Sequence, residues 1–189
     1  MPTLLRMTTP TTWAGHTQGG EPLRRNMERI PLAKPYWDDE CEKAALATLS
    51  SGRWVKGPEG KKFGEEFAKW CGAISAVPCQ SGSAALWAAM RLLDIGPGDE
   101  VIVPGMTFIA TATSVSLAGA TPIFADIEDE YWCICPKDVE AKITDKTKAV
   151  IGVHLFGQAF SPKLREICDE YQIALVEDAA QAHGTTLNG

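Results

Sequence analysis

The chain has 189 residues, of which 45% are apolar and 22% charged, and its formal net charge at pH 7 is −6. This length allows one domain, or one domain with a tail, and the composition excludes a wholly disordered chain, a collagen-like chain and a small disulfide scaffold. No run of like charge is long enough for a nucleic-acid-binding tail, and no apolar run approaches the roughly 18 residues that span a bilayer. We therefore expect neither a nucleic-acid nor a membrane partner.

Residues 1–29 differ from the rest of the chain. Residues 1–26 hold six threonines and one acid, Glu21, and they lack the apolar core of a secretory signal. A transit-like extension is one interpretation, but Met27 opens a stretch that reads like a natural start. We expect 1–29 to be a disordered or wrongly assigned extension, and 30–189 to form the folded domain.

From Pro35 onward, helical and strand patterns alternate. The predicted helices are 38–49 (capped by Asp38 or Asp39), 61–70 (ended by Gly72), one from the small residues at 81–85 to about 93, 108–117, 136–143 and 162–171. The predicted strands are 74–78, 101–103, 121–125, 149–154 and 173–177.

These strands are apolar almost throughout, which predicts an α/β fold with a mainly parallel sheet and helices on both faces. Ligands of such sheets bind at the carboxyl ends of the strands. The chain ends just after a predicted strand and its loop, so we expect an incomplete domain.

Six cysteines show no C-x2-C zinc spacing, and only three histidines accompany them. We expect no metal site. The cysteines are interpreted as small buried side chains of a cytoplasmic protein, where thiols stay reduced.

The segment 81–85 connects a predicted strand to the start of a helix. Free backbone N–H groups and the helix dipole favour a phosphate there, Gly82 allows close approach, and the hydroxyls of Ser81 and Ser83 add donors. The alternative, a serine that only caps the helix, remains open at this point.

Three side chains near the ends of predicted strands complete a possible ligand site. Asp178 follows a buried strand, where a carboxylate needs a cation such as a protonated ring nitrogen, unless it only caps a turn. Gln181 could reach the same ligand, and Phe108 either stacks on a planar ring or packs in the core. A phosphate, a planar ring and a cationic ring nitrogen occur together in pyridoxal 5′-phosphate.

From about Ile30 to Gly189 the sequence resembles the N-terminal half of the DegT/DnrJ/StrS aminotransferases, which use pyridoxal phosphate on sugar substrates. The matching blocks are 30–32, 51–55, 57–58, 81–86, 96–104, 107–112, 119–122, 147–150, 153–158 and 177–184.

This resemblance implies an incomplete large domain of pyridoxal-phosphate fold type I, similar to aspartate aminotransferase. It implies that Ser83 and the Ala84 amide, beside Gly82, bind the cofactor phosphate and that Phe108 stacks on the ring. Asp178 would pair with the ring nitrogen and Gln181 would contact the ring oxygen. An ionised Asp178 keeps the pyridine protonated, which makes the ring an electron sink.

The implied activity is transfer of an amino group from an amino acid, glutamate or glutamine, to a keto-sugar, typically nucleotide-linked, or to a keto-cyclitol. Such enzymes serve amino-sugar, polysaccharide or antibiotic biosynthesis, and we expect a homodimer for the full-length parent. The Schiff-base lysine is expected beyond Gly189, because no lysine follows Lys163. The small C-terminal domain of the family is likewise expected to lie outside these residues. We therefore assign no catalytic residue here and expect this chain alone to be inactive.

Three alternatives stand beside this interpretation. Some relatives are sugar dehydratases, with histidine in place of the lysine. A non-catalytic, truncated paralogue would also lack the lysine. A nucleotide-binding dehydrogenase is disfavoured, because no G-x-G-x-x-G follows the first strand.

Overall fold

The structure is a computed structural model, and it describes residues 34–187. The chain divides into two compact units, Met1–Trp54 and Val55–Gly189, and each is described here by itself. The extension predicted at 1–29 lies outside the described residues. In the first unit, helix α1 (Asp39–Ser50) starts as predicted, with the Asp38 carboxylate accepting a hydrogen bond from the Cys41 N–H at 2.9 Å. None of its residues is buried.

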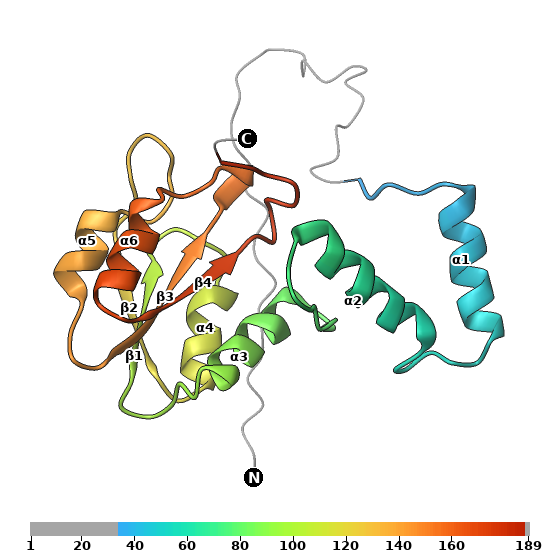
Figure 1. The fold of residues 1–189 in the computed structure, drawn as a ribbon, viewed down its shortest axis with the longest axis horizontal. Coiled ribbons are helices and arrows are strands. Elements are labelled where there is room, and N and C mark those ends of the chain that lie inside the picture. The colour runs from blue at the N-terminus through green and yellow to red at the C-terminus, as the bar shows by residue number, and fades with distance from the viewer. Residues whose placement is uncertain (1–33, 188–189) are drawn as a thin grey trace, which may run out of the picture. The chain divides into compact units, whose positions relative to one another are not determined.

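A four-stranded parallel sheet forms the centre of the second unit (Figure 1). Its strands lie in the order β2-β1-β3-β4, with bounds β1 (Glu100–Pro104), β2 (Thr121–Ala125), β3 (Thr147–Val153) and β4 (Ala174–Asp178). Each neighbouring pair is parallel. All four strands therefore end at one edge of the sheet, which we call the carboxyl edge. The predicted α/β architecture is confirmed.

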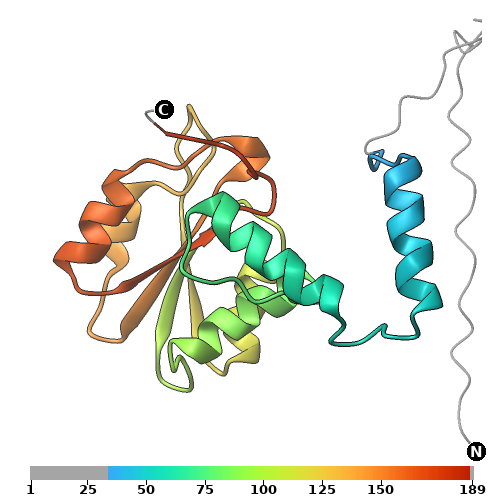
Figure 2. The ribbon, with the colours of Figure 1, turned by 45° about the vertical axis from the view of Figure 1, so that its right-hand side comes forward.

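Helices cover both faces of the sheet (Figures 1 and 2). One face carries α3 (Gly82–Leu92) and α4 (Ala110–Leu117), and the other carries α5 (Pro136–Lys142) and α6 (Lys163–Glu170). Side-chain alternation along the central strands explains this, because successive residues of a strand face opposite sides. Val101 and Val103 belong to the apolar cluster under α3 and α4, while Ile102 belongs to the cluster under α5 and α6.

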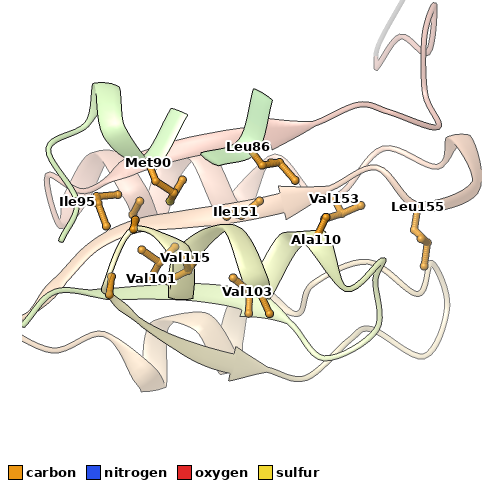
Figure 3. Close-up of a cluster of buried hydrophobic side chains, with 14 residues drawn as sticks. Leu86, Met90, Ile95, Val101, Val103, Ala110, Val115, Ile151, Val153 and Leu155 are labelled. Carbon is orange, nitrogen blue, oxygen red and sulfur yellow. The ribbon is translucent and has the colours of Figure 1, made fainter. Parts of the chain in front are cut away.

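Helix α3 runs against the direction of the strands. Ile95, Met90 and Leu86 follow one another along the sheet, from the side of Val101 toward the side of Val153 (Figure 3). Because α3 begins just before Leu86, its N-terminus faces the carboxyl edge. In the chain, α3 is preceded by helix α2 (Pro58–Cys71). This helix starts three residues earlier than predicted and ends, as predicted, at Gly72, which has a left-handed conformation.

Some sequence predictions are wrong in their details. The segment 74–78 is not a strand, because no strand of the described residues lies beside it to complete a hydrogen-bonded ladder. The edge strands β2 and β4 are only partly buried, whereas the central strands are buried almost throughout. Among residues 34–187, no helix combines the length and the apolar character that crossing a bilayer requires.

Gly152 of β3 makes room for the buried ring of Phe160. A Cβ added at this glycine would lie 2.5 Å from Phe160 Cε1, far inside van der Waals contact. We predict that Gly152→Ala lowers the free energy of unfolding by about 1–3 kcal/mol, since overpacking forces shifts of the ring or the strand. Gly60→Ala is the control, because its Cβ meets no atom within 4 Å and alanine favours a helix. Equal urea midpoints for the two variants would contradict this packing.

The six cysteines are all unpaired but differ in exposure. Cys133 and Cys168 are buried as predicted, whereas the expectation of burial is wrong for Cys71 and Cys79, which are exposed. Burial raises the pKa of the Cys168 thiol to about 11. At pH 8 this thiol stays protonated, and the thiolate is the reactive form.

We therefore predict that a thiol reagent at pH 8 modifies Cys71 and Cys79 in the native chain, and modifies Cys168 only after unfolding. Peptide mass spectrometry of timed samples measures this order. Labelling of Cys168 as fast as that of Cys71 would show that α6 is not packed as described.

Candidate functional site

The N-terminus of α3 has two kinds of backbone N–H group. The Ser81 hydroxyl caps the helix by accepting a hydrogen bond from the Ala84 N–H at 3.2 Å, and the Ser81 carbonyl accepts the Ala85 N–H at 3.0 Å. In the described part of the chain, the N–H groups of Gly82 and Ser83 have no acceptor. A Cβ on Gly82 would meet no atom within 4 Å, so the space beside it is open.

Both interpretations of this segment therefore apply, but to different residues. Ser81 is a helix cap, whereas Gly82 and Ser83 offer two free N–H groups and a hydroxyl at the positive end of a helix dipole. The Ala84 amide, which the resemblance assigns to a phosphate, already has a partner in Ser81. An anion would have to compete with the cap for it.

Asp178 is the last residue of β4 and is half-buried, not deeply buried as expected. β4 is an edge strand, which explains the difference. Its Oδ1 accepts the Ala180 N–H at 3.1 Å, so the turn-cap interpretation holds for one oxygen. The second oxygen, Oδ2, has no hydrogen-bond partner among residues 34–187 and can accept one from a ligand.

Phe108 lies in the loop between β1 and α4, because α4 begins two residues later than predicted. Its side chain is 69% exposed, so the core-packing interpretation is wrong. An exposed aromatic ring at this position has a face available for stacking on a planar ligand.

Gln181 follows β4 and is exposed. Its side-chain carbonyl Oε1 accepts the Phe156 backbone N–H at 2.7 Å. This contact joins the loop after β3 to the loop after β4. The amide nitrogen of Gln181 has no acceptor in the described residues.

Two residues of the loop after β3 were not singled out from the sequence. His154 directly follows β3: its N–H donates to the Asp178 carbonyl at 3.0 Å, and its ring nitrogen Nε2 lies 3.2 Å from Glu177 Oε2. Phe156 holds the Gln181 side chain. Both residues lie within the matching block 153–158, but no local pattern identified their partners, which are more than 20 residues away.

The sheet order brings these groups to one edge. Phe108 follows β1, the loop at 154–157 follows β3, and Asp178 and Gln181 stand at or just after the end of β4. The N-terminus of α3 faces the same edge, as the order of Leu86 and Met90 along the sheet shows (Figure 3). β1 and β3 are neighbours, yet the chain leaves them in opposite directions, to β2 on one side and β4 on the other. Such a switch point is where parallel α/β sheets bind ligands.

The side chains of Phe108 and Phe156 are exposed at this edge. Two hollows in the described residues lie elsewhere, one along α2 and residues 73–78, the other beside residues 143–148 and 171–173. Neither of them contains any of the predicted site residues.

The two serines at the N-terminus of α3 are predicted to differ in their effects on stability and on phosphate binding. We expect Ser81→Ala to lower the free energy of unfolding by about 1 kcal/mol, the cost of a lost helix cap. Ser83→Ala should change it by less than about 0.5 kcal/mol, as at an ordinary surface position. Ser83→Ala removes a hydroxyl that has no partner among the described residues, so it should weaken binding of a phosphate ester, for which pyridoxamine 5′-phosphate is the probe. Urea unfolding and calorimetric titration measure both, and a reversal of either effect would contradict the assignment.

Comparison with known proteins identifies relatives of the chain. The profile of the DegT/DnrJ/EryC1/StrS aminotransferase family matches residues 35–189. The dTDP-3-amino-3,4,6-trideoxy-alpha-D-glucose transaminase of Streptomyces venezuelae is 45% identical over 151 residues, which are 79% of this chain and 40% of that protein. The L-glutamine:2-deoxy-scyllo-inosose aminotransferase of Streptomyces paromomycinus is 37% identical over 183 residues, which are 91% of this chain and 42% of that protein.

Solved structures agree with the fold. GDP-4-keto-6-deoxymannose-3-dehydratase, solved with a trapped PLP-glutamate geminal diamine, superposes with a TM-score of 0.79 at 30% identity over 85% of this chain and 44% of that one. The sheet and its helices are accordingly part of the large domain of a fold type I pyridoxal-phosphate enzyme. The chain spans less than half the length of the relatives it matches. It belongs to the DegT/DnrJ/EryC1/StrS aminotransferase family.

Proposed function

We propose that the chain is the cofactor-binding part of an aminotransferase that uses pyridoxal 5′-phosphate. The enzyme would move an amino group from glutamate or glutamine to a keto-sugar, typically nucleotide-linked, or to a keto-cyclitol. The observation that supports this proposal is that a helix N-terminus with two free N–H groups, an exposed aromatic ring and a carboxylate with a free oxygen lie at one switch point of the sheet. Two relatives named above act on a dTDP-linked sugar and on a cyclitol with L-glutamine.

The residues present fit the cofactor from its phosphate to its ring. The Gly82 and Ser83 N–H groups and the Ser83 hydroxyl bind the phosphate, and the α3 dipole favours its negative charge. The Phe108 ring covers one face of the pyridine and excludes water from it.

The free Oδ2 of Asp178 accepts a hydrogen bond from the ring nitrogen and holds a proton there, because a carboxylate stabilises the cationic form of its partner. Gln181 contacts the ring oxygen. When bound, the cofactor supplies an electron sink for the carbon that loses or gains the amino group.

The substrate and a second subunit would complete this open edge. Phe156 is 72% exposed there, and a second copy of the enzyme would cover it in a homodimer. Six unpaired cysteines suit a reducing compartment, which supports a cytoplasmic location.

We distinguish the chain from the whole enzyme. No lysine follows Lys163, which is exposed at the start of α6. Transamination needs an amine base at the cofactor. We therefore propose that these 189 residues bind the cofactor and do not transaminate alone.

A dehydratase is the second candidate, because one such enzyme superposes on this chain with a TM-score of 0.79. The part of the fold that the two share does not separate the two activities. Their products do, since an aminotransferase adds nitrogen to the sugar and a dehydratase removes water.

The test uses the product of the complete reading frame that contains these residues, loaded with pyridoxal phosphate. First, glutamate or glutamine labelled with ¹⁵N on the α-amino group is added alone, and conversion of the bound cofactor to its pyridoxamine form is followed by absorbance. Failure with both donors would contradict the proposal. A keto-sugar and 2-deoxy-scyllo-inosose are then added, and ¹⁵N in the product indicates an aminotransferase. Loss of water without ¹⁵N indicates the dehydratase.

Asp178→Asn tests the ring-nitrogen contact in the 189-residue chain. The variant keeps the shape of the side chain but loses its charge, so binding of pyridoxamine 5′-phosphate should weaken by about 1.5–3 kcal/mol, the range for a hydrogen bond to a charged group. Because Asp178 is half-buried, we expect less than the ~3–5 kcal/mol lost when a fully buried pair is broken. Pyridoxamine phosphate is preferred as the probe because it has no aldehyde to react with surface lysines.

Glu177→Gln is the matched control. Glu177 precedes Asp178 in β4, and its carboxylate contacts His154 and Arg165 instead of the free space at the strand end. Its substitution should leave the dissociation constant unchanged. Equal losses in the two variants, or no loss with Asp178→Asn, would show that Asp178 is misassigned.

A further inference from the structure

The turn after β3 contains a strained residue. Residues Leu155–Gly157 form a single 3-10 turn in which Phe156 has φ 55° and ψ 23°, and Gly157 has φ 85°. The left-handed conformation is unfavourable for a residue with a side chain, because Cβ comes too close to the following carbonyl oxygen. The Phe156 ring is 72% exposed, so burial of the ring does not compensate for this cost. Strain of this kind persists where the surrounding structure imposes it, and it is often found at functional sites.

Contacts on both sides impose this turn. Leu155 is buried in the core, and the Gln158 N–H closes the turn onto the Leu155 carbonyl at 3.0 Å. The Thr185 hydroxyl donates to the Gly157 carbonyl at 3.0 Å, and the His154 N–H donates to the Asp178 carbonyl at 3.0 Å. The turn is therefore fixed to the segment that carries Asp178 and Gln181.

The consequence of the turn is the direction of one N–H group. Phe156 N–H points at Gln181 Oε1 and donates to it at 2.7 Å. A glutamine side chain ends in an acceptor oxygen and a donor nitrogen of nearly equal size. A backbone N–H can only donate, so it selects the oxygen. The Gln181 NH₂ group must then point away from Phe156, and it has no acceptor among residues 34–187.

We propose that Phe156 is a positioning residue: its left-handed backbone fixes Gln181 with the amide nitrogen presented as a donor. This inference rests on the proposed function and deepens it. A ligand bound at the carboxyl edge must then offer an acceptor oxygen to Gln181, as the ring oxygen of a pyridoxal-type cofactor does. Glutamate at position 181 would still accept the Phe156 N–H but would offer no donor.

The first experiment tests the orientation without any ligand. Hydrogen exchange of the Phe156 amide is measured by NMR in the ¹⁵N-labelled 189-residue chain. Gln181→Ala removes the acceptor and should speed exchange of this amide by about tenfold, the equivalent of a 1.4 kcal/mol hydrogen bond. Gln181→Glu keeps the acceptor and should keep the protection.

Gln158→Ala is the control, because Gln158 lies in the same loop and its side chain donates only to the neighbouring Ala159 carbonyl. Protection of the β3 amides reports that each variant is folded. Unchanged Phe156 exchange in Gln181→Ala would overturn the inference, as would equal acceleration in Gln181→Glu.

The second experiment tests the use of the donor. Pyridoxamine 5′-phosphate and its analogue without the ring oxygen are titrated into the wild-type chain and into Gln181→Glu. We expect the wild type to prefer the oxygen-bearing ligand by about tenfold, the worth of one hydrogen bond, and the variant to lose this preference. If both ligands bind the wild type equally, the inference is wrong although the cofactor site stands. If neither binds, the proposed function fails, while the exchange measurement still decides the orientation of Gln181.

Discussion

The burial of β1 and β3 on both faces is the constraint on which the rest of the structure depends. Their residues alternate between two apolar clusters, so neither face of the central strands has room for a ligand. Polar groups and exposed backbone are left to the strand ends, because unpaired polar groups inside the sheet would be costly. Parallel pairing then collects the segments after β1, β3 and β4 at one edge. The antiparallel course of α3 adds a helix N-terminus there, so one packing arrangement supplies an anion site, a ring face and a carboxylate.

Most of this fold could be predicted from the sequence, because its determinants are local. The apolar strands are separated by breakers such as Gly72 and by the turn at 96–99, and the structure confirms four of the five predicted strands. The exception, 74–78, has an apolar pattern but no neighbouring strand among the described residues, and a strand exists only with a partner. Burial of β4 was overestimated for the same reason: the sequence reveals that a strand is apolar, but not that it lies at an edge.

The candidate site, like the fold, could be predicted from the sequence only in part. Asp178, Phe108 and the start of α3 were identified because each stands at the end of a predicted element, where position alone indicates exposure to a ligand. What the sequence did not reveal are the partners that these groups take within the protein. Ser81 occupies the Ala84 amide, and Phe156 occupies one end of Gln181. The first is a choice between two adjacent serines, and the second joins residues 25 positions apart through a left-handed turn that phenylalanine does not favour.

The most direct test of the account is a map of where a cofactor-like ligand contacts the chain. Pyridoxamine 5′-phosphate is titrated into the ¹⁵N-labelled chain, and the backbone resonances that move are assigned. A single ligand site at the carboxyl edge predicts that the affected residues gather at positions 82–84, 108, 156, 178 and 181, with one shared dissociation constant. Shifts confined to the hollow beside residues 143–148 and 171–173, or to α2, would contradict the account, because they would separate phosphate binding from the strand ends.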